Sequence, residues 1–293
     1  MNTRNLRFRS NRVRDILGLF HEELDVLYGR DEVGVFCEML FEAWLGWDKV
    51  RLLTSKEQTI DQSDLLRFHW ALEDLKVYRP IQHIIGYTDF CGCRIAVNPD
   101  VLVPRPETEE IIQWIITQLS IPHFPFSVLD LCTGSGCIAI ALKKAFPEAA
   151  VTAVEVSEKA LAMAKENAES NGTDITLLQA DILNCQLPTV SYQLIVSNPP
   201  YVRDSERAQM QRNVLDYDPV LALFVPDDDP LRFYRAIAAI ARQSLSPDGL
   251  LVVEINEALA EETCSLLRNH GFRPEVHEDY RGKPRWVSAV WNP

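Results

Sequence analysis

The sequence predicts an α/β protein in which a doubly wound, mostly parallel sheet follows a small bundle of helices. Apolar runs of strand length alternate with helical patterns after Phe126, which is typical of repeated βα units. Before about residue 78 the pattern is helical only, and near the C-terminus two strand-like runs flank a turn sequence. With 293 residues, the chain is long enough for one large or two medium domains.

The N-terminal part predicts at least three amphipathic helices. Apolar residues recur at three- and four-residue spacing along the first of them: Val13, Ile16, Leu17, Phe20, Leu24 and Leu27. A second apolar segment covers residues 33–45, and a third covers residues 65–75, with Ser63 as the expected cap. Residues 1–78 are therefore expected to form a helical domain.

A β-hairpin is expected to link this domain to the rest of the chain over residues 79–103. Residues 84–87 and 94–97 would be its strands, on either side of Cys91-Gly92. Two prolines then end the hairpin, and a helix is expected over residues 109–119. Residues 104–293 would form the third and largest part.

The largest part predicts seven strands. Five are expected at residues 128–131, 151–155, 175–178, 194–196 and 250–255, with helices over residues 136–146, 158–171 and 231–245. A last helix over residues 258–270 precedes two closing strands near Glu275 and at residues 287–291. These two runs predict an antiparallel C-terminal hairpin.

Composition narrows the classes of function. The formal net charge of −13 argues against sequence-independent binding of nucleic acid, which needs a basic surface. No apolar run approaches the length of a membrane-spanning helix, and the N-terminus leads into no signal-peptide core. The seven cysteines include no C-x-x-C pair, so we expect neither a metal site nor disulfides, and a cytoplasmic location.

Asn198-Pro199-Pro200-Tyr201 follows an apolar strand at residues 193–197 and predicts a binding site for a flat amino group. Prolines fix φ and lack an N–H, so carbonyl oxygens at this strand end stay free and fixed in direction. The side-chain oxygen of Asn198 and the carbonyl of Pro199 could together accept two N–H bonds, with the Tyr201 ring stacked on the substrate. The plain alternative is an ordinary strand exit marked by Asn and Pro.

The loop after the first strand of the sheet predicts a cofactor site. Small residues there let the backbone approach a ligand at a helix N-terminus. The loop lacks the G-x-G-x-x-G pattern of dinucleotide sites, and an acidic residue beside it would repel a pyrophosphate but accept hydrogen bonds from an ammonium group. This favours S-adenosylmethionine over NAD. The expected cofactor residues are Asp130, Cys132, Thr133, Gly134, Ser135 and Gly136, with Glu155 on the ribose diol.

Two further residues follow the third strand of the sheet. The Asp181 carboxylate is expected to meet the adenine amino group, while Ile182 packs on the ring and Asn198 completes the cofactor site. For Asp181 the alternative is a helix cap.

In this order along the chain, the motifs resemble class I S-adenosylmethionine-dependent methyltransferases that modify planar amino groups. One branch acts on adenine in DNA or RNA, and the other acts on protein glutamine. Pro104-Arg105-Pro106-Glu107-Thr108-Glu109, after residues 82–86 and a hairpin, resembles the second branch, in particular the peptide chain release factor glutamine methyltransferases, the PrmC or HemK family. The resemblance covers nearly the whole chain, including Gly282-Lys283-Pro284-Arg285, and the sister family for a ribosomal protein lacks the P-R-P-E-T-E form.

The resemblance implies a Rossmann-like, seven-stranded methyltransferase domain that uses S-adenosylmethionine and no metal. It implies a monomer that binds class I release factors through its helical domain and hairpin, with no direct contact to nucleic acid or membrane. The acceptor would be the glutamine of the Gly-Gly-Gln loop, held by Asn198, Pro199, Pro200 and Tyr201. Of these, Asn198, Pro199 and Tyr201 would be catalytic.

Three positions depart from the family pattern. Cys132 stands where glycine is usual, Glu155 where aspartate is usual, and Ile182 where a larger ring is frequent. We expect modest effects on cofactor affinity from the first two. Glu107 and Glu109 could line the pocket, or they could cap the helix that follows.

Three alternatives remain at this point. An adenine-amino methyltransferase would need a basic groove and a target-recognition insert, and the acidic balance counts against it. A glutamine methyltransferase of a ribosomal protein would share the same cradle. A non-catalytic S-adenosylmethionine-binding protein is disfavoured because both the loop and the Asn-Pro-Pro-Tyr motif are intact.

Overall fold

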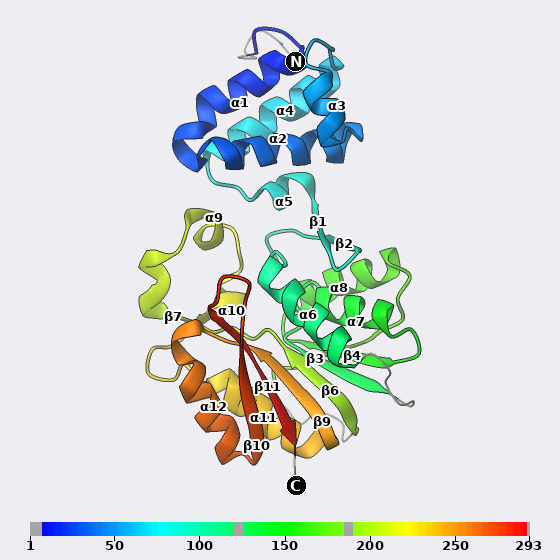
Figure 1. Cartoon of the computed structure of the whole chain (residues 1–293), viewed down its shortest axis with the longest axis vertical. Helices are drawn as coiled ribbons and strands as arrows, with labels where there is room; N and C mark the ends of the chain where they lie inside the picture. The colour runs from blue at the N-terminus through cyan, green and yellow to red at the C-terminus, as the bar shows by residue number, and fades with distance from the viewer. Residues whose placement is uncertain (1–7, 120–125, 185–189, 292–293) are drawn as a thin grey trace. The chain divides into compact units, whose positions relative to one another are not determined.

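The computed structural model describes residues 8–119, 126–184 and 190–291, which form two compact units (Figure 1). The first unit consists of Met1–Gly86 together with Arg212–Tyr217. The second consists of Tyr87–Gln211 and Asp218–Pro293. The six cysteines among the described residues are all free thiols.

The first unit is a helical bundle around an apolar core. Its helices are α1 (Val13–Tyr28), α2 (Arg30–Leu45), α3 (Lys49–Thr54), α4 (Gln62–Lys76) and α5 (Ile81–Ile85). The periodicity of the first predicted helix is confirmed, because Val13, Ile16, Phe20 and Leu24 are fully buried. Leu27, at the end of the same series, is 39% exposed.

Two local expectations in this unit were wrong, and one helix was not predicted. Residues 84–86 are not part of a strand, because α5 occupies Ile81–Ile85 and ends at Gly86, whose φ of 92° terminates a helix. The first strand of the hairpin begins only at Tyr87. Ser63 lies inside the first turn of α4 and not at its cap, a position held by Asp61 without a side-chain hydrogen bond. The short helix α3, capped by Asp48, was not predicted.

A segment distant in sequence completes this unit. Helix α9 (Arg212–Leu215) and the residues after it belong to the helical bundle. The Tyr217 hydroxyl donates to the Val77 carbonyl at 2.9 Å, and the Arg212 guanidinium lies 4.7 Å from the centre of the Tyr78 ring. No pattern in the sequence indicates this return of the chain.

The second unit contains a seven-stranded sheet in the order β10-β11-β9-β6-β3-β4-β5. Its strands are β3 (Ser127–Leu131), β4 (Ala150–Glu155), β5 (Thr176–Gln179), β6 (Tyr192–Ser197), β9 (Leu245–Glu254), β10 (Phe272–Glu278) and β11 (Pro284–Trp291). Strands β9, β6, β3, β4 and β5 are parallel to their neighbours in that series, whereas β11 runs antiparallel to both β9 and β10. The predicted fold class, including the antiparallel closing hairpin, is confirmed.

Helices cover both faces of this sheet (Figure 1). One core joins the sheet to α6 (Pro106–Gln118), α7 (Cys137–Ala145) and α8 (Glu158–Ser170). The other joins it to α11 (Arg232–Ser244) and α12 (Ala260–Asn269). Both faces of β3 are buried, and Val128 faces the first core whereas Leu129 faces the second.

Two predicted boundaries in this unit need correction. Helix α6 begins at Pro106 and not at Glu109, because proline fits the first helical position, where its missing N–H is not needed. Strand β9 begins at Leu245 and not at Leu250, and its register with β6 shifts after the Tyr192–Leu245 pair.

The linking hairpin has other bounds than the sequence predicts, and several short elements of the second unit were not predicted. The linking hairpin pairs β1 (Tyr87–Phe90) with β2 (Cys93–Ala96). Between β6 and α11 lie β7 (Val202–Arg203), η2 (Asp204–Gln209), α10 (Val220–Leu223) and β8 (Phe224–Val225), and η3 (Glu257–Leu259) precedes α12.

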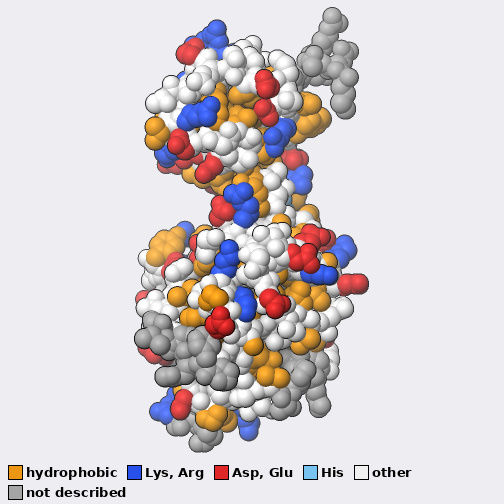
Figure 2. Space-filling model, turned by 90° about the vertical axis from the view of Figure 1, so that its right-hand side faces the viewer, with side chains coloured by type: hydrophobic (Ala, Val, Ile, Leu, Met, Phe, Trp, Pro, Cys, Tyr) orange, Lys and Arg blue, Asp and Glu red, His pale blue; other side chains and the backbone are white. Residues whose placement is uncertain are grey.

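The surface carries charges of both signs. On the face shown in Figure 2, basic and acidic side chains of the described residues are interspersed. Within the described ranges, no helix has both the length and the apolar character required to cross a bilayer.

Asn167, on α8, joins the hairpin to the loop that follows β3. Its side chain is fully buried, and its Oδ1 accepts from the Ala96 N–H at 2.7 Å. Its Nδ2 donates to the carbonyls of Ala96 at 3.0 Å and Ser135 at 2.9 Å. The carboxamide thereby pairs with one buried and two partly buried backbone groups.

We expect Asn167→Ala to lower the free energy of unfolding by about 2–4 kcal/mol, because it leaves these backbone groups unpaired. Urea titration followed by circular dichroism measures this loss. Asn171→Ala is the matched control, since Asn171 donates to the Arg94 carbonyl at a partly exposed position one turn away. A loss for Asn167→Ala no larger than for the control would contradict the bridging role.

Candidate active site

The candidate site lies where the order of the parallel strands reverses, between β3 and β6. Strands β4 and β5 lie on one side of β3, and β6 and β9 lie on the other. Leu131 pairs with Ser197 at the carboxyl ends of the two central strands, and the Ser197 hydroxyl donates to the Leu131 carbonyl at 2.7 Å. Open α/β sheets bind their ligands in the crevice at this point.

A cavity of about 380 Å³ opens there, a volume typical of small-molecule sites. The sequence-predicted residues that line it are Cys132, Thr133, Gly134, Ser135, Glu155, Asp181, Asn198 and Pro200. Those that lie outside its wall are Asp130, Gly136, Ile182, Pro199 and Tyr201. Further walls, not predicted, come from Leu102, Arg105, Thr108, Leu221, Phe224 and Phe233, among others.

The loop between β3 and α7 owes its shape to three residues with positive φ. They are Cys132 at 62°, Gly134 at 56° and Gly136 at 82°. Only glycine adopts this region without strain, so Cys132 carries a cost of about 1–2 kcal/mol. Burial and the nearby Glu155 carboxylate raise the pKa of the Cys132 thiol well above its ordinary value, so the cavity wall there is a neutral thiol.

Gly136 needs its missing side chain for a second reason. A Cβ built on Gly136 would lie 3.1 Å from the Ala164 Cβ, whereas one built on Gly134 would meet nothing within 4 Å. Gly136 is thus the point where α7 and α8 approach each other closely.

Asp130 lies fully buried behind the loop. Its Oδ2 accepts from the Thr133 hydroxyl at 2.5 Å and from the Ala139 N–H at 3.2 Å, and its Oδ1 has no partner among the described residues. Burial raises the pKa of Asp130 to about 7, and the Glu155 carboxylate contributes to the rise. An unpartnered buried carboxylate oxygen can accept from a cationic donor, but Asp130 lies behind the cavity wall and not in it.

Glu155 ends β4 with its carboxylate turned back onto the chain. Its Oε1 accepts from the N–H groups of Val156 and Ser157, both at 2.9 Å, and its Oε2 accepts from the Gly134 N–H at 3.0 Å. A carboxylate has about four lone-pair sites, so roughly one remains for a ligand hydroxyl. The bond from Gly134 ties the Glu155 carboxylate to the loop between β3 and α7.

The structure separates the two residues predicted after β5. Asp181 lines the cavity, and its oxygens also accept from the Leu183 N–H at 2.9 Å and the Asn184 Nδ2 at 2.7 Å. Ile182 is buried in the core on the α11 face of the sheet and does not reach the cavity. Leu183 lines the cavity in its place, because the turn after Asp181 directs Ile182 inward.

Asn198 and Tyr201 each make one side-chain hydrogen bond. The Asn198 Nδ2 donates to the Thr108 Oγ1 at 3.3 Å, which leaves Oδ1 available as an acceptor. The Tyr201 hydroxyl donates to the Glu254 Oε1 at 2.9 Å. Pro199 and Pro200 are buried, and no described residue donates to the Pro199 carbonyl.

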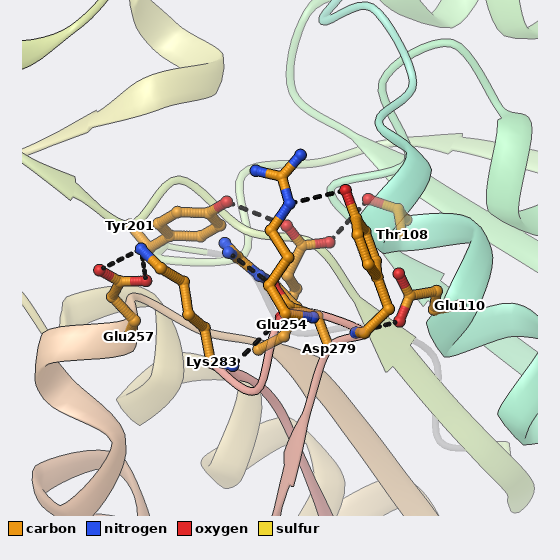
Figure 3. Close-up of polar contacts among 10 residues, drawn as sticks. Thr108, Glu110, Tyr201, Glu254, Glu257, Asp279 and Lys283 are labelled. Atoms are coloured by element: carbon orange, nitrogen blue, oxygen red, sulfur yellow. Dashed lines mark hydrogen bonds and ion pairs between the residues drawn. The ribbon is translucent and has the colours of Figure 1, made fainter.

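Glu254, which the sequence analysis did not single out, connects these contacts (Figure 3). Its carboxylate is 2% exposed and accepts from the Thr108 hydroxyl at 2.7 Å as well as from Tyr201. Burial raises the pKa of Glu254, against the effect of these bonds and of Arg285. Burial and the same carboxylate raise the pKa of Tyr201 well above 10, so its phenol stays protonated.

The hairpin between β10 and β11 supports this group from one side (Figure 3). Arg285 forms an ion pair with the buried Asp279 at 3.1 Å, and the Asp279 carboxylate also accepts from the Lys283 N–H. The Tyr280 N–H donates to the Glu110 Oε2 at 3.0 Å, which ties the hairpin tip to α6.

The segment Pro104–Glu109 meets neither of the two expectations for Glu107 and Glu109, which were lining of the pocket and capping of the helix. Neither Glu107 nor Glu109 lines the cavity, and Glu109 accepts from the Cys91 N–H at 2.5 Å instead of capping its own helix. The cavity residues of this motif are Pro104, Arg105, which pairs with the buried Asp218, and Thr108. Thr108 lies within the quoted motif, so a helical projection that placed it opposite the two glutamates could have identified it.

We expect Gly136→Ala to lower the free energy of unfolding by roughly 2–3 kcal/mol, because the new methyl group adds crowding to backbone strain. Gly134→Ala introduces strain alone and should cost about 1 kcal/mol. Chemical denaturation of the two variants measures the difference. Equal losses would show that the contact with Ala164 does not limit the approach of α8.

Two family models match the sequence. The model described as "Methyltransferase small domain" matches residues 113–216, and the "PrmC N-terminal domain" model matches residues 28–86. The catalytic domain of hMettl16, solved in complex with a MAT2A 3′UTR hairpin, resembles the fold with a TM-score of 0.55 at 16% identity, over 82% of this chain and 85% of that one. That likeness concerns the fold alone.

Two relatives extend over almost the entire chain. The release factor glutamine methyltransferase of Flavobacterium psychrophilum is 42% identical over 273 residues, which are 92% of this chain and 96% of the relative. The enzyme of the same name from Bacteroides thetaiotaomicron is 38% identical over 276 residues, 94% of this chain and 98% of the relative. With this identity at full length, and with a methyltransferase sheet that carries the motifs at its switch point, the chain belongs to the release factor glutamine methyltransferase family.

Proposed function

We propose that this chain transfers the methyl group of S-adenosylmethionine to the side-chain amide nitrogen of the glutamine in the Gly-Gly-Gln loop of class I release factors. One observation carries the proposal: Asn198, at the end of β6, lines the same cavity as the loop that follows the adjacent strand β3. The names of the relatives support the identity of the acceptor.

The residues around the cavity fit the cofactor group by group. Glu155 and Asp181 line the cavity, where the remaining acceptor site of Glu155 would suit one ribose hydroxyl and Asp181 the adenine amino group. Asp130 lies behind the cavity wall, and its unpartnered Oδ1 would accept from the ammonium. When bound, S-adenosylmethionine supplies an electrophilic methyl group on a sulfonium. No metal ligand is assigned, and within the described residues no cluster of three or more His, Cys, Asp or Glu could hold one.

Asn198 and Pro199 would hold the acceptor. The Asn198 Oδ1 and the Pro199 carbonyl can each accept one N–H of the glutamine amide, which increases the electron density on its nitrogen. Both oxygens are held in place, the first through Thr108 and the second by the proline ring. Orientation of this kind can contribute roughly 7–11 kcal/mol to a transfer reaction. Tyr201 would stack on the amide plane, with its hydroxyl held by Glu254.

The three parts of the chain would divide the work between recognition of the release factor and catalysis. We propose residues 1–78 as the domain that recognises the release factor, residues 79–103 as a hairpin linker and residues 104–293 as the catalytic domain. The match of residues 28–86 to the N-terminal domain of the family supports the first assignment. A monomer in the cytoplasm, without direct nucleic-acid contact, fits a substrate of the translation apparatus.

Asp130→Asn tests the ammonium site. Between about pH 4 and pH 7 the unfolded chain releases the Asp130 proton while the folded chain keeps it, so the free energy of unfolding falls as the pH rises. Asparagine does not titrate, so it removes this loss of stability at higher pH. Its side-chain oxygen can still accept from the Thr133 hydroxyl and the Ala139 N–H. We expect the variant to be about 2–4 kcal/mol more stable near pH 8, unchanged near pH 4, and at least roughly tenfold weaker in S-adenosylmethionine binding.

Thermal unfolding at the two pH values and calorimetric titration with the cofactor give the two readouts. Unchanged cofactor affinity in Asp130→Asn would remove Asp130 from the binding site, whatever the result for stability.

Asn198→Ala tests the acceptor cradle. Loss of one oriented hydrogen-bonding group at a reacting centre lowers turnover by roughly 100-fold or more, and the affinity for S-adenosylmethionine should stay within a few-fold. The measurement is transfer of labelled methyl from S-adenosylmethionine to a purified release factor. Turnover equal to that of the wild type would exclude the cradle.

The acceptor itself is tested with a release factor in which the glutamine of the Gly-Gly-Gln loop is replaced by alanine. We expect no label on this factor. Label that persists on it, that goes to a ribosomal protein, or that goes to DNA would overturn the proposed function.

A further inference from the structure

Three side chains, from α6, from β9 and from the segment between β6 and β7, form one chain of hydrogen bonds to Asn198. The Asn198 Nδ2 lies 3.3 Å from the Thr108 Oγ1 of α6, and that oxygen lies 2.7 Å from the Glu254 Oε2 of β9. The second Glu254 oxygen, Oε1, accepts from the Tyr201 hydroxyl at 2.9 Å (Figure 3). Thr108 and Glu254 are each 2% exposed, so water does not compete for these bonds.

The chemistry of the donors and acceptors fixes the direction of this chain. An ionised carboxylate can only accept, so the single hydrogen of the Thr108 hydroxyl is directed to Glu254. The Thr108 oxygen can then only accept from Asn198, which therefore turns its NH2 end toward Thr108. The Asn198 Oδ1 is left facing away from Thr108, where an acceptor substrate can use it.

We propose that Glu254 and Thr108 are positioning residues that decide which end of the Asn198 carboxamide faces the acceptor. The inference rests on the proposed function and deepens it by naming how the site distinguishes glutamine from glutamate. An oxygen presented by Asn198 accepts an N–H of a glutamine amide. The same oxygen repels a glutamate carboxylate, which is ionised at neutral pH and has no hydrogen to donate.

The direction of the chain depends on the charge of Glu254. Four groups from the surrounding elements face it besides Thr108: Tyr201, Tyr234, Arg285 and Glu107. Arg285 is held by Asp279 and favours the ionised form of Glu254, whereas Glu107 opposes it. When Glu254 takes up a proton, it can donate to the Thr108 oxygen. The Thr108 hydrogen is then free for Asn198, and the carboxamide can turn over.

Thr108→Val is the direct test, because it replaces the hydroxyl by a methyl group of similar size. Without an acceptor at Thr108, Asn198 is free to present its NH2 end. We expect kcat with the release factor to fall about tenfold and cofactor affinity to stay within twofold. A factor carrying Gln→Glu in the Gly-Gly-Gln loop should inhibit the variant about fivefold more strongly than the wild type. Thr108→Ser keeps the hydroxyl and should behave as the wild type in all three measurements.

Glu254→Gln provides an independent measurement. Because burial raises the pKa of Glu254, the kcat of the wild type should fall on the acid side as Glu254 takes up its proton. The variant has no such carboxylate and should lack this acid limb while its kcat is lower at neutral pH. The double variant with Thr108→Val should lose no more activity than the worse single variant, because both changes interrupt one chain.

The outcomes separate the two proposals. A wild-type chain that does not methylate the release factor overturns the proposed function. A wild-type chain that methylates it, with unchanged kcat and unchanged inhibition by the glutamate factor in Thr108→Val, overturns only the positioning role. Additive losses in the double variant, or an acid limb retained in Glu254→Gln, also overturn that role.

Discussion

The parallel pairing of β3 with β6 is the constraint on which the site depends. It sets Leu131 beside Ser197, so the loop that begins at Cys132 and the motif that begins at Asn198 leave the sheet from adjacent positions. The hydrogen bond from the Ser197 hydroxyl to the Leu131 carbonyl closes this edge. A shift by one residue would turn each side chain of β6 to the opposite face, so burial of both faces fixes the register and the distance between the two motifs.

The same sheet brings the acceptor half of the site together. Ser197 pairs with Val253 of β9, which places Glu254 one residue beyond the strand pair and beside the Asn-Pro-Pro-Tyr motif. Trp286 of β11 in turn pairs with Glu254, so Arg285 enters from the antiparallel hairpin. The closing hairpin therefore does more than complete the sheet, because it brings a cation to the carboxylate that holds Tyr201 and Thr108.

The sequence predicts the features that depend on residues close together in the chain. It does not predict the contacts between residues far apart in the chain. The βα alternation and the loop after β3 are local, so their strands and positive-φ glycines follow from the residues themselves. Thr108 and Glu254 lie 146 positions apart, and only the assembled sheet shows that they touch. Residues 84–86 lie at a helix end although the sequence predicts a strand there, because a short apolar run before glycine fits a strand as well as a helix end. No local sequence pattern predicts that Tyr217 packs against the helical bundle.

The distribution of charge around the cavity explains why its two halves suit different ligands. On the acceptor side, the buried Glu254 is accompanied by Arg285 and by two hydroxyl donors. On the cofactor side, Asp130 and Glu155 accept hydrogen bonds from backbone N–H groups, and Asp130 also accepts from the Thr133 hydroxyl. The Glu155 carboxylate raises the pKa of Asp130, and both carboxylates raise the pKa of the Cys132 thiol. Among the described residues, no cation is a main influence on the pKa of Asp130 or Cys132, and a positive charge there would favour the ionised carboxylates. A ligand that carries an ammonium and a sulfonium would supply that charge, whereas a pyrophosphate would increase the repulsion.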